Sequence, residues 1–201
     1  MLFETDLALR PSGGSGLLVS SMSAFRRYQL ESAWLWEHQA LTRARFCAGD
    51  AAIGAVFDAL RRDLLQAARD PAQLAAEVLT MRQRMLDAHP NRSALFDLKH
   101  DRGAMVDIEF IVQYLVLAHS RAHYELTGNL GNIALLHMAG ALGLIPGALA
   151  QRVADAYRDY RRLQHRLRLN GAEFARVDRA SVAAHADATL ALWKAVFAPG
   201  T

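Results

Sequence analysis

The sequence predicts a mainly α protein, in which a helical bundle follows a short β remnant. Three observations support this fold class. After residue 23, apolar residues recur at helical spacing over most of the chain. Asp70 and Pro71, with Gln73 following, form a strong helix start, because Asp caps a helix and Pro fits its first position. Only the first twenty residues contain short apolar runs interrupted by Pro and Gly, which is typical of strand ends.

Two short strands are expected at the start of the chain. Residues 2–9 alternate weakly, residues 10–16 form a Pro- and Gly-rich loop, and residues 17–20 predict a second strand. Two strands alone are not stable in water, so we interpret this start as the end of a larger sheet. Leu17, Leu18 and Val19 are therefore expected to lack part of their cover.

The rest of the chain is expected to be helical. The predicted helices span approximately residues 23–46, 51–68, 71–89, 105–121, 129–142, 146–169 and 181–197. A short extended piece at residues 95–99 precedes a turn at residues 101–103. The helix that begins near residue 105 is apolar almost all round, and so we expect it to be the central helix of the bundle.

Composition limits the possible functions. The chain has 201 residues, of which 52% are hydrophobic and 21% charged, a globular balance. The formal charge of +3 is small, and no basic stripe with interleaved aromatic residues is present, so no nucleic-acid partner is expected. Nearly all the basic residues are Arg, which suits phosphate sites but also follows from a GC-rich genome.

The single cysteine and the chain start indicate a cytoplasmic location. Cys47 excludes a disulfide within the chain and a zinc site built on Cys pairs, which fits a reducing compartment. The first residues lack the basic and apolar regions of a signal peptide. The nearly uncharged residues 132–151 are broken by Gly and Pro, so no membrane span is expected.

Two features near the start are candidates for nucleotide chemistry. Asp6 lies in a predicted strand beside the Gly-rich loop, where a carboxylate can bind magnesium. A surface Asp on an edge strand is the alternative. The loop at residues 11–16 can hold phosphate with its backbone amides, although it lacks the Lys of a P-loop. An ordinary flexible hairpin explains the same residues.

Glu37 and His38 are the next candidates. They lie in a helix with bulky or functional side chains on both sides, a pattern that suits a helix packed between two layers. The pair can act as acid and base. A structural ion-pair network with Arg43 and Arg45 is the favoured alternative.

Three polar residues interrupt the apolar helix near residue 105. Asp107, Glu109 and Gln113 are expected to be buried, and buried carboxylates require partners. The candidate partners are Arg43, Arg45 and Lys99. Metal binding is the alternative. No zinc-binding His pattern and no Ser nucleophile motif occurs, so independent catalysis is not indicated.

Four segments together resemble a known family. They are residues 6–13 with 16–19, residues 28–29 with 33–41 and 43–45, residues 96–99, and residue 103 with residues 107–110 and 113–115. In order and spacing they resemble the end of the adenylyltransferase half of the bacterial bifunctional glutamine synthetase adenylyltransferase/adenylyl-removing enzymes. The most specific segment is the Trp-x-Trp-Glu-His-Gln-Ala-Leu run at residues 34–41.

This resemblance implies a nucleotidyltransferase fold of the DNA-polymerase-β type. The family transfers AMP from ATP to a tyrosine of glutamine synthetase with magnesium, and it responds to the PII signal protein. Asp6 matches the third metal-binding carboxylate of the fold, and so takes the metal and catalytic roles. Arg10, Ser12 and Gly13 match the nucleotide-binding loop. Residues 1–47 would then end the nucleotidyltransferase domain, and residues 48–201 would form a C-terminal helical domain.

Departures from the family pattern bear on activity. No Gly-Ser turn with an Asp-x-Asp precedes Asp6, Ala8 replaces a usual Arg, and Ala104 replaces a usual Gly. One carboxylate cannot hold two metals, so we expect this chain alone to be inactive. An upstream catalytic fragment would be a further partner. The alternative is a non-catalytic helical module that docks glutamine synthetase or PII.

Overall fold

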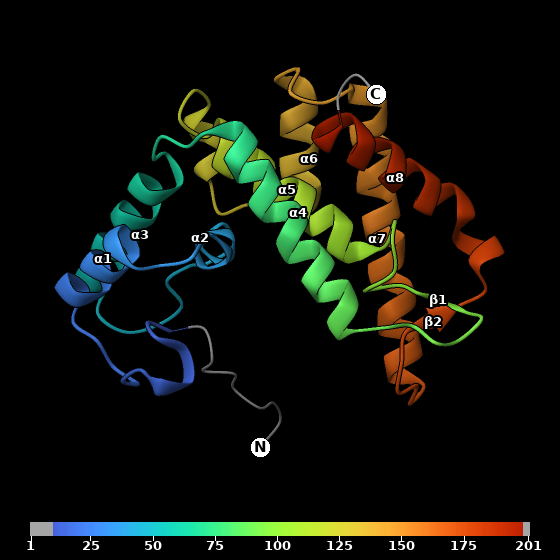
Figure 1. Ribbon diagram of the computed structural model, residues 1–201, viewed down its shortest axis with the longest axis horizontal. Coiled ribbons are helices and arrows are strands. Elements are labelled where there is room, and N and C mark those ends of the chain that lie inside the picture. The colour runs from blue at the N-terminus through green and yellow to red at the C-terminus, as the bar shows by residue number, and fades with distance from the viewer. Residues whose placement is uncertain (1–9, 199–201) are drawn as a thin grey trace. The chain divides into compact units, whose positions relative to one another are not determined.

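The structure, a computed structural model, describes residues 10–198. These residues form eight α-helices, three 3-10 helices and one two-stranded sheet, which confirms the mainly α fold class with a short β element (Figure 1). The chain divides into two compact units. The first contains residues up to 68 and residues 119–129, and the second contains residues 69–118 and those from 130 onward.

The described part of the first unit contains three α-helices and two 3-10 helices. They are η1 (Gly13–Ser15), α1 (Met22–Glu31), α2 (Leu35–Leu41), α3 (Ala51–Leu65) and η2 (Tyr124–Thr127). The hydroxyl of Ser21 caps α1 by accepting a hydrogen bond from the amide of Ala24 at 3.2 Å. The carboxylate of Asp50 caps α3 through the amide of Ala52 at 2.7 Å. Both caps satisfy amides that the first helical turn leaves without partners.

The single helix predicted over residues 23–46 is wrong, because the chain breaks between α1 and α2. The amides of Ser32 and Ala33 both donate to the carbonyl oxygen of Tyr28, which closes the end of α1. Trp34 is then extended, with φ −76° and ψ 156°. The side chain of Glu37 accepts a hydrogen bond from the amide of Trp34 at 3.1 Å and so starts a new helix.

The strand predicted over residues 17–20 is also wrong. These residues have no regular secondary structure. Leu17, Leu18 and Val19 are nevertheless exposed, as expected for apolar residues that lack cover. The strand predicted over residues 2–9 lies outside the described residues.

The second unit contains five helices and the sheet. The helices are α4 (Pro71–Ala88), α5 (Met105–His119, of which His119 belongs to the first unit), α6 (Asn132–Ala141), α7 (Gly147–Leu169) and α8 (Ala183–Phe197). Asp70 caps α4 by accepting from the amide of Gln73 at 2.8 Å, which confirms that predicted start. Strands β1 (Phe96–Asp97) and β2 (Arg176–Val177) pair antiparallel.

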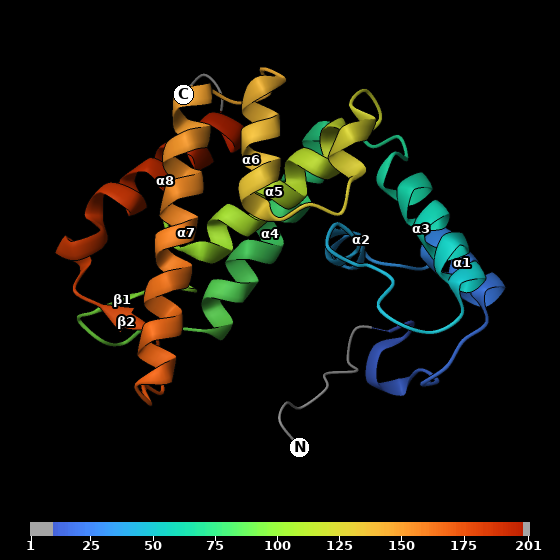
Figure 2. The ribbon, with the colours of Figure 1, turned by 180° about the vertical axis from the view of Figure 1, so that it is seen from behind.

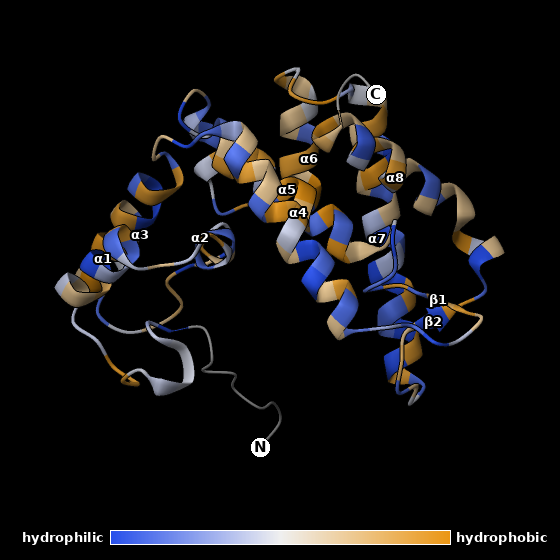
Figure 3. Ribbon diagram, in the orientation of Figure 1, coloured by the Kyte–Doolittle hydropathy of each residue, from blue (hydrophilic) through white to orange (hydrophobic). Residues whose placement is uncertain are grey.

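The core of the second unit surrounds α5. Figure 3 shows several strongly apolar turns on this helix beside its label, and its residues Ile108, Ile111 and Val116 are buried. Helix α7 packs against both α6 and α8 (Figure 2). The hydroxyl of Tyr160, a buried residue of α7, donates to the carbonyl oxygen of Gly103 at 3.0 Å. The prediction of a central apolar helix is therefore confirmed. None of the described helices has the length and apolar character needed to cross a bilayer.

Candidate functional site

The Gly-rich loop at residues 10–16 folds onto itself. The guanidinium of Arg10 donates to the carbonyl oxygens of Gly14 and Gly16, both at 3.3 Å. The amides of Gly13 and Gly16 donate to the carbonyl oxygens of Arg10 and Gly13. A Cβ at Gly16 would lie 1.9 Å from the carbonyl oxygen of Pro11, so this closure requires glycine. The structure thus brings Arg10 and Gly13 together, but two amides of the loop are used within it.

The described residues do not provide a grouped ligand set for magnesium. Asp6 lies outside them, and residues 10–198 contain no group of three or more His, Cys, Asp or Glu side chains that could hold a metal ion. Ser12 and Gly13 lie in a loop whose hydrogen bonds are largely internal. The roles of Asp6, Arg10, Ser12 and Gly13 therefore stay predictions.

Glu37 and His38 have separate partners. The carboxylate of Glu37 accepts from the hydroxyl of Tyr28 at 2.9 Å, in addition to the amide of Trp34. The Nε2 atom of His38 lies 3.0 Å from the carbonyl oxygen of Gln29. Glu37 therefore ties α1 to α2 and caps α2, and the predicted network with Arg43 and Arg45 is wrong for this carboxylate. Trp34 is 70% exposed, so packing between two layers is also wrong.

Arg61, a buried arginine that the sequence did not single out, lies beside the end of α2 in the first unit. The guanidinium of Arg61 donates to the carbonyl oxygens of Leu41 at 2.6 Å and of Thr42 and Thr127 at 2.7 Å. These carbonyls lie at the ends of α2 and η2, where helices leave acceptors without partners. Burial lowers the pKa of Arg61 from its ordinary value, but an arginine remains charged at neutral pH. Arg61 therefore caps two helical ends with a buried positive charge.

A cavity of about 400 Å³ borders Arg61. Arg45, Arg62, Asp58 and the backbone around Asn129 also line it. Arg45, a predicted site residue, is thus placed beside two further arginines. Arg43, the other predicted arginine, is exposed at the end of α2.

The buried carboxylate Asp107 is paired with Arg82. Its Oδ1 atom lies 2.5 Å from Nε of Arg82, and its Oδ2 atom accepts from the amide of Gly103 at 2.6 Å. Both side chains are fully buried. Nη2 of Arg82 also donates to the carbonyl oxygen of His100 at 2.7 Å. The prediction that Asp107 needs a partner is confirmed, but the partners proposed for it, Arg43, Arg45 and Lys99, are wrong.

A sequence signal for Arg82 exists in α4. The buried residues of this helix are Leu74, Val78 and Arg82, spaced by four, which places the arginine on the apolar face. The other polar residues of α5 lie in the same unit. Glu109 accepts from the hydroxyl of Tyr157 at 3.0 Å, and Gln113 is buried.

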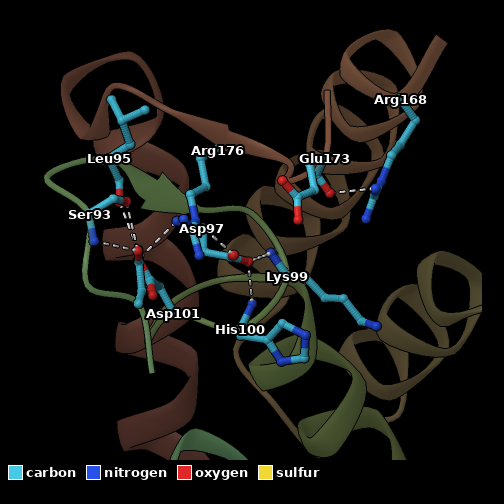
Figure 4. A network of polar contacts seen from close by, with 10 residues as sticks. Ser93, Leu95, Asp97, Lys99, His100, Asp101, Arg168, Glu173 and Arg176 are labelled. Carbon is cyan, nitrogen blue, oxygen red and sulfur yellow. Dashed lines mark hydrogen bonds and ion pairs between the residues drawn. The ribbon is translucent and has the colours of Figure 1, made fainter. Parts of the chain in front are cut away.

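A second polar cluster organises the turn after β1 (Figure 4). The Oδ1 atom of Asp97 accepts from the amides of Lys99 and His100, both at 2.9 Å. Its Oδ2 atom lies 3.4 Å from Nε of Arg176 on β2. Asp101 accepts from the amide of Asp97 at 2.9 Å, so two carboxylates fix the turn through backbone amides.

A cavity of about 360 Å³ adjoins this turn. Lys99, the last predicted site residue, lines it together with His89, His100, Arg168, Glu173 and Arg176. The rings of His89 and His100 lie 4.3 Å apart. Burial, together with Lys99 and His89, lowers the pKa of His100, so this imidazole is neutral at pH 7. The cations here face the carboxylates of Asp97 and Glu173, which offset most of their charge.

Two family models match the chain in succession. The model for glutamate-ammonia ligase adenylyltransferase matches residues 1–60. The model for GlnD PII-uridylyltransferase matches residues 72–174, which include α4 except its first residue, strand β1, and all of α5, α6 and α7.

Curated relatives match almost the whole chain. A protein of Aromatoleum aromaticum is 61% identical over 98% of the chain, one of Ralstonia nicotianae is 59% identical over 98%, and one of Burkholderia mallei is 56% identical over 98%. Each carries the name bifunctional glutamine synthetase adenylyltransferase/adenylyl-removing enzyme. The matched region covers 21% or 22% of these relatives, so the chain spans about a fifth of their length.

Proposed function

The chain belongs to the family of bifunctional glutamine synthetase adenylyltransferase/adenylyl-removing enzymes, and from this we propose that it forms the C-terminal portion of the half that adenylylates glutamine synthetase. In this proposal the complete enzyme transfers AMP from ATP to a tyrosine of glutamine synthetase, in the cytoplasm. The observation that carries the proposal is 61% identity over 98% of the chain to a relative of that name.

The proposal assigns roles to the first residues. Asp6 would be the third metal-binding carboxylate, and Arg10, Ser12 and Gly13 would contact the nucleotide. Residues 1–47 would end the nucleotidyltransferase domain, with residues 48–201 as the helical domain behind it. The remaining carboxylates would come from an upstream catalytic part, so the chain alone would be inactive.

A chimera tests this proposal. The matched segment of the Aromatoleum aromaticum relative would be replaced by this chain, and adenylyl transfer from labelled ATP to glutamine synthetase would be measured with magnesium. We expect the chimera to transfer AMP and the chain alone to transfer none. Asp6→Asn in the chimera should reduce transfer by at least about a hundredfold, the scale of losing a metal-held charge contact. Asp87→Asn, at an exposed position late in α4, is the matched control. Full transfer by the Asp6→Asn chimera would refute the assigned role.

A second candidate function is a non-catalytic module that docks glutamine synthetase or PII. It is favoured by the second unit, whose turn after β1 and whose sheet are held by hydrogen bonds within that unit. PII is included as a partner in this candidate function because residues 72–174 match a model for PII-uridylyltransferases. Sedimentation of the chain with purified glutamine synthetase or PII distinguishes the candidates. A complex that Asp6→Asn leaves intact supports docking, and no complex with either protein removes it.

A further inference from the structure

Arg61 carries a buried charge that no carboxylate neutralises by direct contact. Its side chain is 4% exposed, and all three of its hydrogen bonds go to neutral carbonyl oxygens. Asp58 interacts with it only through its electrostatic field, and Arg62 opposes that effect. A buried charge is costly unless an opposite charge compensates it. The hydrogen bonds of Arg61 are satisfied, but its charge is not balanced.

The cavity beside Arg61 adds to this imbalance. Three guanidinium groups line it, from Arg45, Arg61 and Arg62, against the single carboxylate of Asp58. Within residues 10–198, the side chains of Arg45 and Arg62 form no hydrogen bond or ion pair. The lining therefore has an excess of two positive charges, in contrast with the cavity at His100, where two carboxylates face the cations.

The walls of this cavity are fixed by the fold. The side-chain amide of Asn129 donates to the carbonyl oxygen of Ala44 at 3.2 Å, and Arg61 holds Thr127 to the same region. Phe46 packs on Gly54 of α3, where a Cβ would come within 2.7 Å of its ring. The segment that carries Arg45 is thus held against α3, which carries Arg61 and Arg62. The backbone of these segments therefore loses little freedom when an anion binds, whereas the exposed side chains of Arg45 and Arg62 become ordered on binding.

We propose that this cavity binds a phosphate group, either as inorganic phosphate or as part of a nucleotide. Phosphate carries between one and two negative charges at neutral pH, and the positive excess of the lining favours its doubly charged form. The planar guanidinium of arginine binds phosphate through two parallel hydrogen bonds, and Arg45 and Arg62 have donors available for them. A volume of about 400 Å³ admits a ligand larger than phosphate itself. The site does not depend on the proposed adenylyl transfer, because none of its residues is assigned to that reaction.

Phosphate titration of the whole ¹⁵N-labelled chain tests this site. Sodium phosphate would be added at constant ionic strength with chloride as the replaced anion, and amide resonances would be followed. We expect saturable shifts at Arg62, Gly128 and Asn129. Arg45→Gln and Arg62→Gln should each weaken phosphate binding about tenfold, because each removes one charge-assisted contact. Arg27→Gln on α1, equally exposed and outside the lining, is the matched control and should leave the affinity unchanged.

Each outcome decides the proposal. The proposal is overturned if these amides show no saturable shifts. It is also overturned if Arg62→Gln binds phosphate with the same affinity as the unsubstituted chain. Because Arg45 and Arg62 are exposed, both variants should fold, and unchanged resonances in the second unit verify this. A parallel titration with AMP identifies the source of the phosphate. Tighter binding of AMP with the same arginine dependence supports a nucleotide site, and binding of phosphate without AMP supports a site for the free anion.

Discussion

Each of the two units buries an arginine, but the charge of that arginine is compensated differently in the two units. In the second unit, Arg82 is fully buried and its charge is neutralised by Asp107 at 2.5 Å. In the first unit, Arg61 is almost as buried but contacts only the carbonyl oxygens of helical ends. Helix ends carry partial negative charge, which compensates a cation only in part. The difference indicates that Arg82 belongs to a closed structural core, whereas Arg61 supports a surface cavity that can take an anion.

The largest expected change in stability tests the buried ion pair between Arg82 and Asp107. Arg82→Met would leave the carboxylate of Asp107 buried without its cation, and breaking one side of such a pair costs about 3–5 kcal/mol. We expect the free energy of unfolding of the second unit to fall by this amount in urea titrations followed by tryptophan fluorescence at Trp193. Arg84→Met, two residues away on the exposed side of α4, should change it by less than about 0.5 kcal/mol. A loss below about 1 kcal/mol for Arg82→Met would contradict the view of a buried pair.

A smaller loss is expected at Arg61. Arg61→Met removes an uncompensated charge but leaves three carbonyl oxygens without donors, at about 1–3 kcal/mol for a buried group. Water in the adjoining cavity can satisfy part of them, so we expect a loss of about 2 kcal/mol in the first unit. Fluorescence at Trp34 and Trp36 during urea unfolding measures it, with Arg62→Met as the control. If Arg61→Met costs as much as Arg82→Met, the contrast between the two arginines fails.

Acid should affect the surroundings of Arg82 through His100. The groups facing this imidazole are Lys99, His89, Asp97 and Arg82, and the pKa of His100 is lowered mainly by burial. The folded state thus keeps His100 neutral while the unfolded chain, with a pKa of about 6.5, takes up the proton first. Stability is therefore retained above about pH 6.5 and declines as the pH falls from there towards the lower pKa of the folded state.

The measurement is the free energy of unfolding between pH 7.5 and pH 5. We expect His100→Asn to flatten its decline with acid, while His165→Asn, at an exposed position of α7, should not. His119, whose pKa is lowered by burial and by His123, contributes separately in the first unit. An unchanged pH dependence in His100→Asn would show that this imidazole is not the group that resists protonation.

The sequence predicted those parts of the fold that depend on local signals. The start of α4 follows from Asp70 and Pro71, because capping involves neighbouring residues only. The break between α1 and α2 was missed because Trp34 is an unusual capping residue and the start of α2 depends on the reach of Glu37. The need of Asp107 for a cation was predictable from its apolar surroundings. Its partner was not, because Arg82 meets it only when α4 packs against α5.

The candidate sites divide in the same way. The sequence singled out Arg45 but not Arg61 and Arg62. Arg45 lies in the segment after α2, whereas Arg61 and Arg62 lie in α3, and the three side chains line one cavity only in the folded chain. Arg61 lies in an ordinary amphipathic helix, and no local pattern indicates that it caps α2 and η2. Clusters of like charge that tertiary packing assembles leave no motif, and so only the structure reveals them.

The smallest expected effect concerns the contact that positions Arg45. Gly54→Ala would favour α3 by about 1 kcal/mol through helix propensity, but its Cβ would come within 2.7 Å of the ring of Phe46. Phe46 is 38% exposed and can move outward, so the overpacking cost stays near the low end of about 1–3 kcal/mol. We expect a net loss below about 1 kcal/mol in urea unfolding, together with weaker phosphate binding because Arg45 moves with Phe46.

Gly147→Ala is the control, because a Cβ meets open space at this position at the start of α7. It should keep or raise stability and leave phosphate binding unchanged. If Gly54→Ala leaves the phosphate affinity intact, the position of Arg45 does not depend on this contact, and Arg61 and Arg62 alone would have to hold the anion.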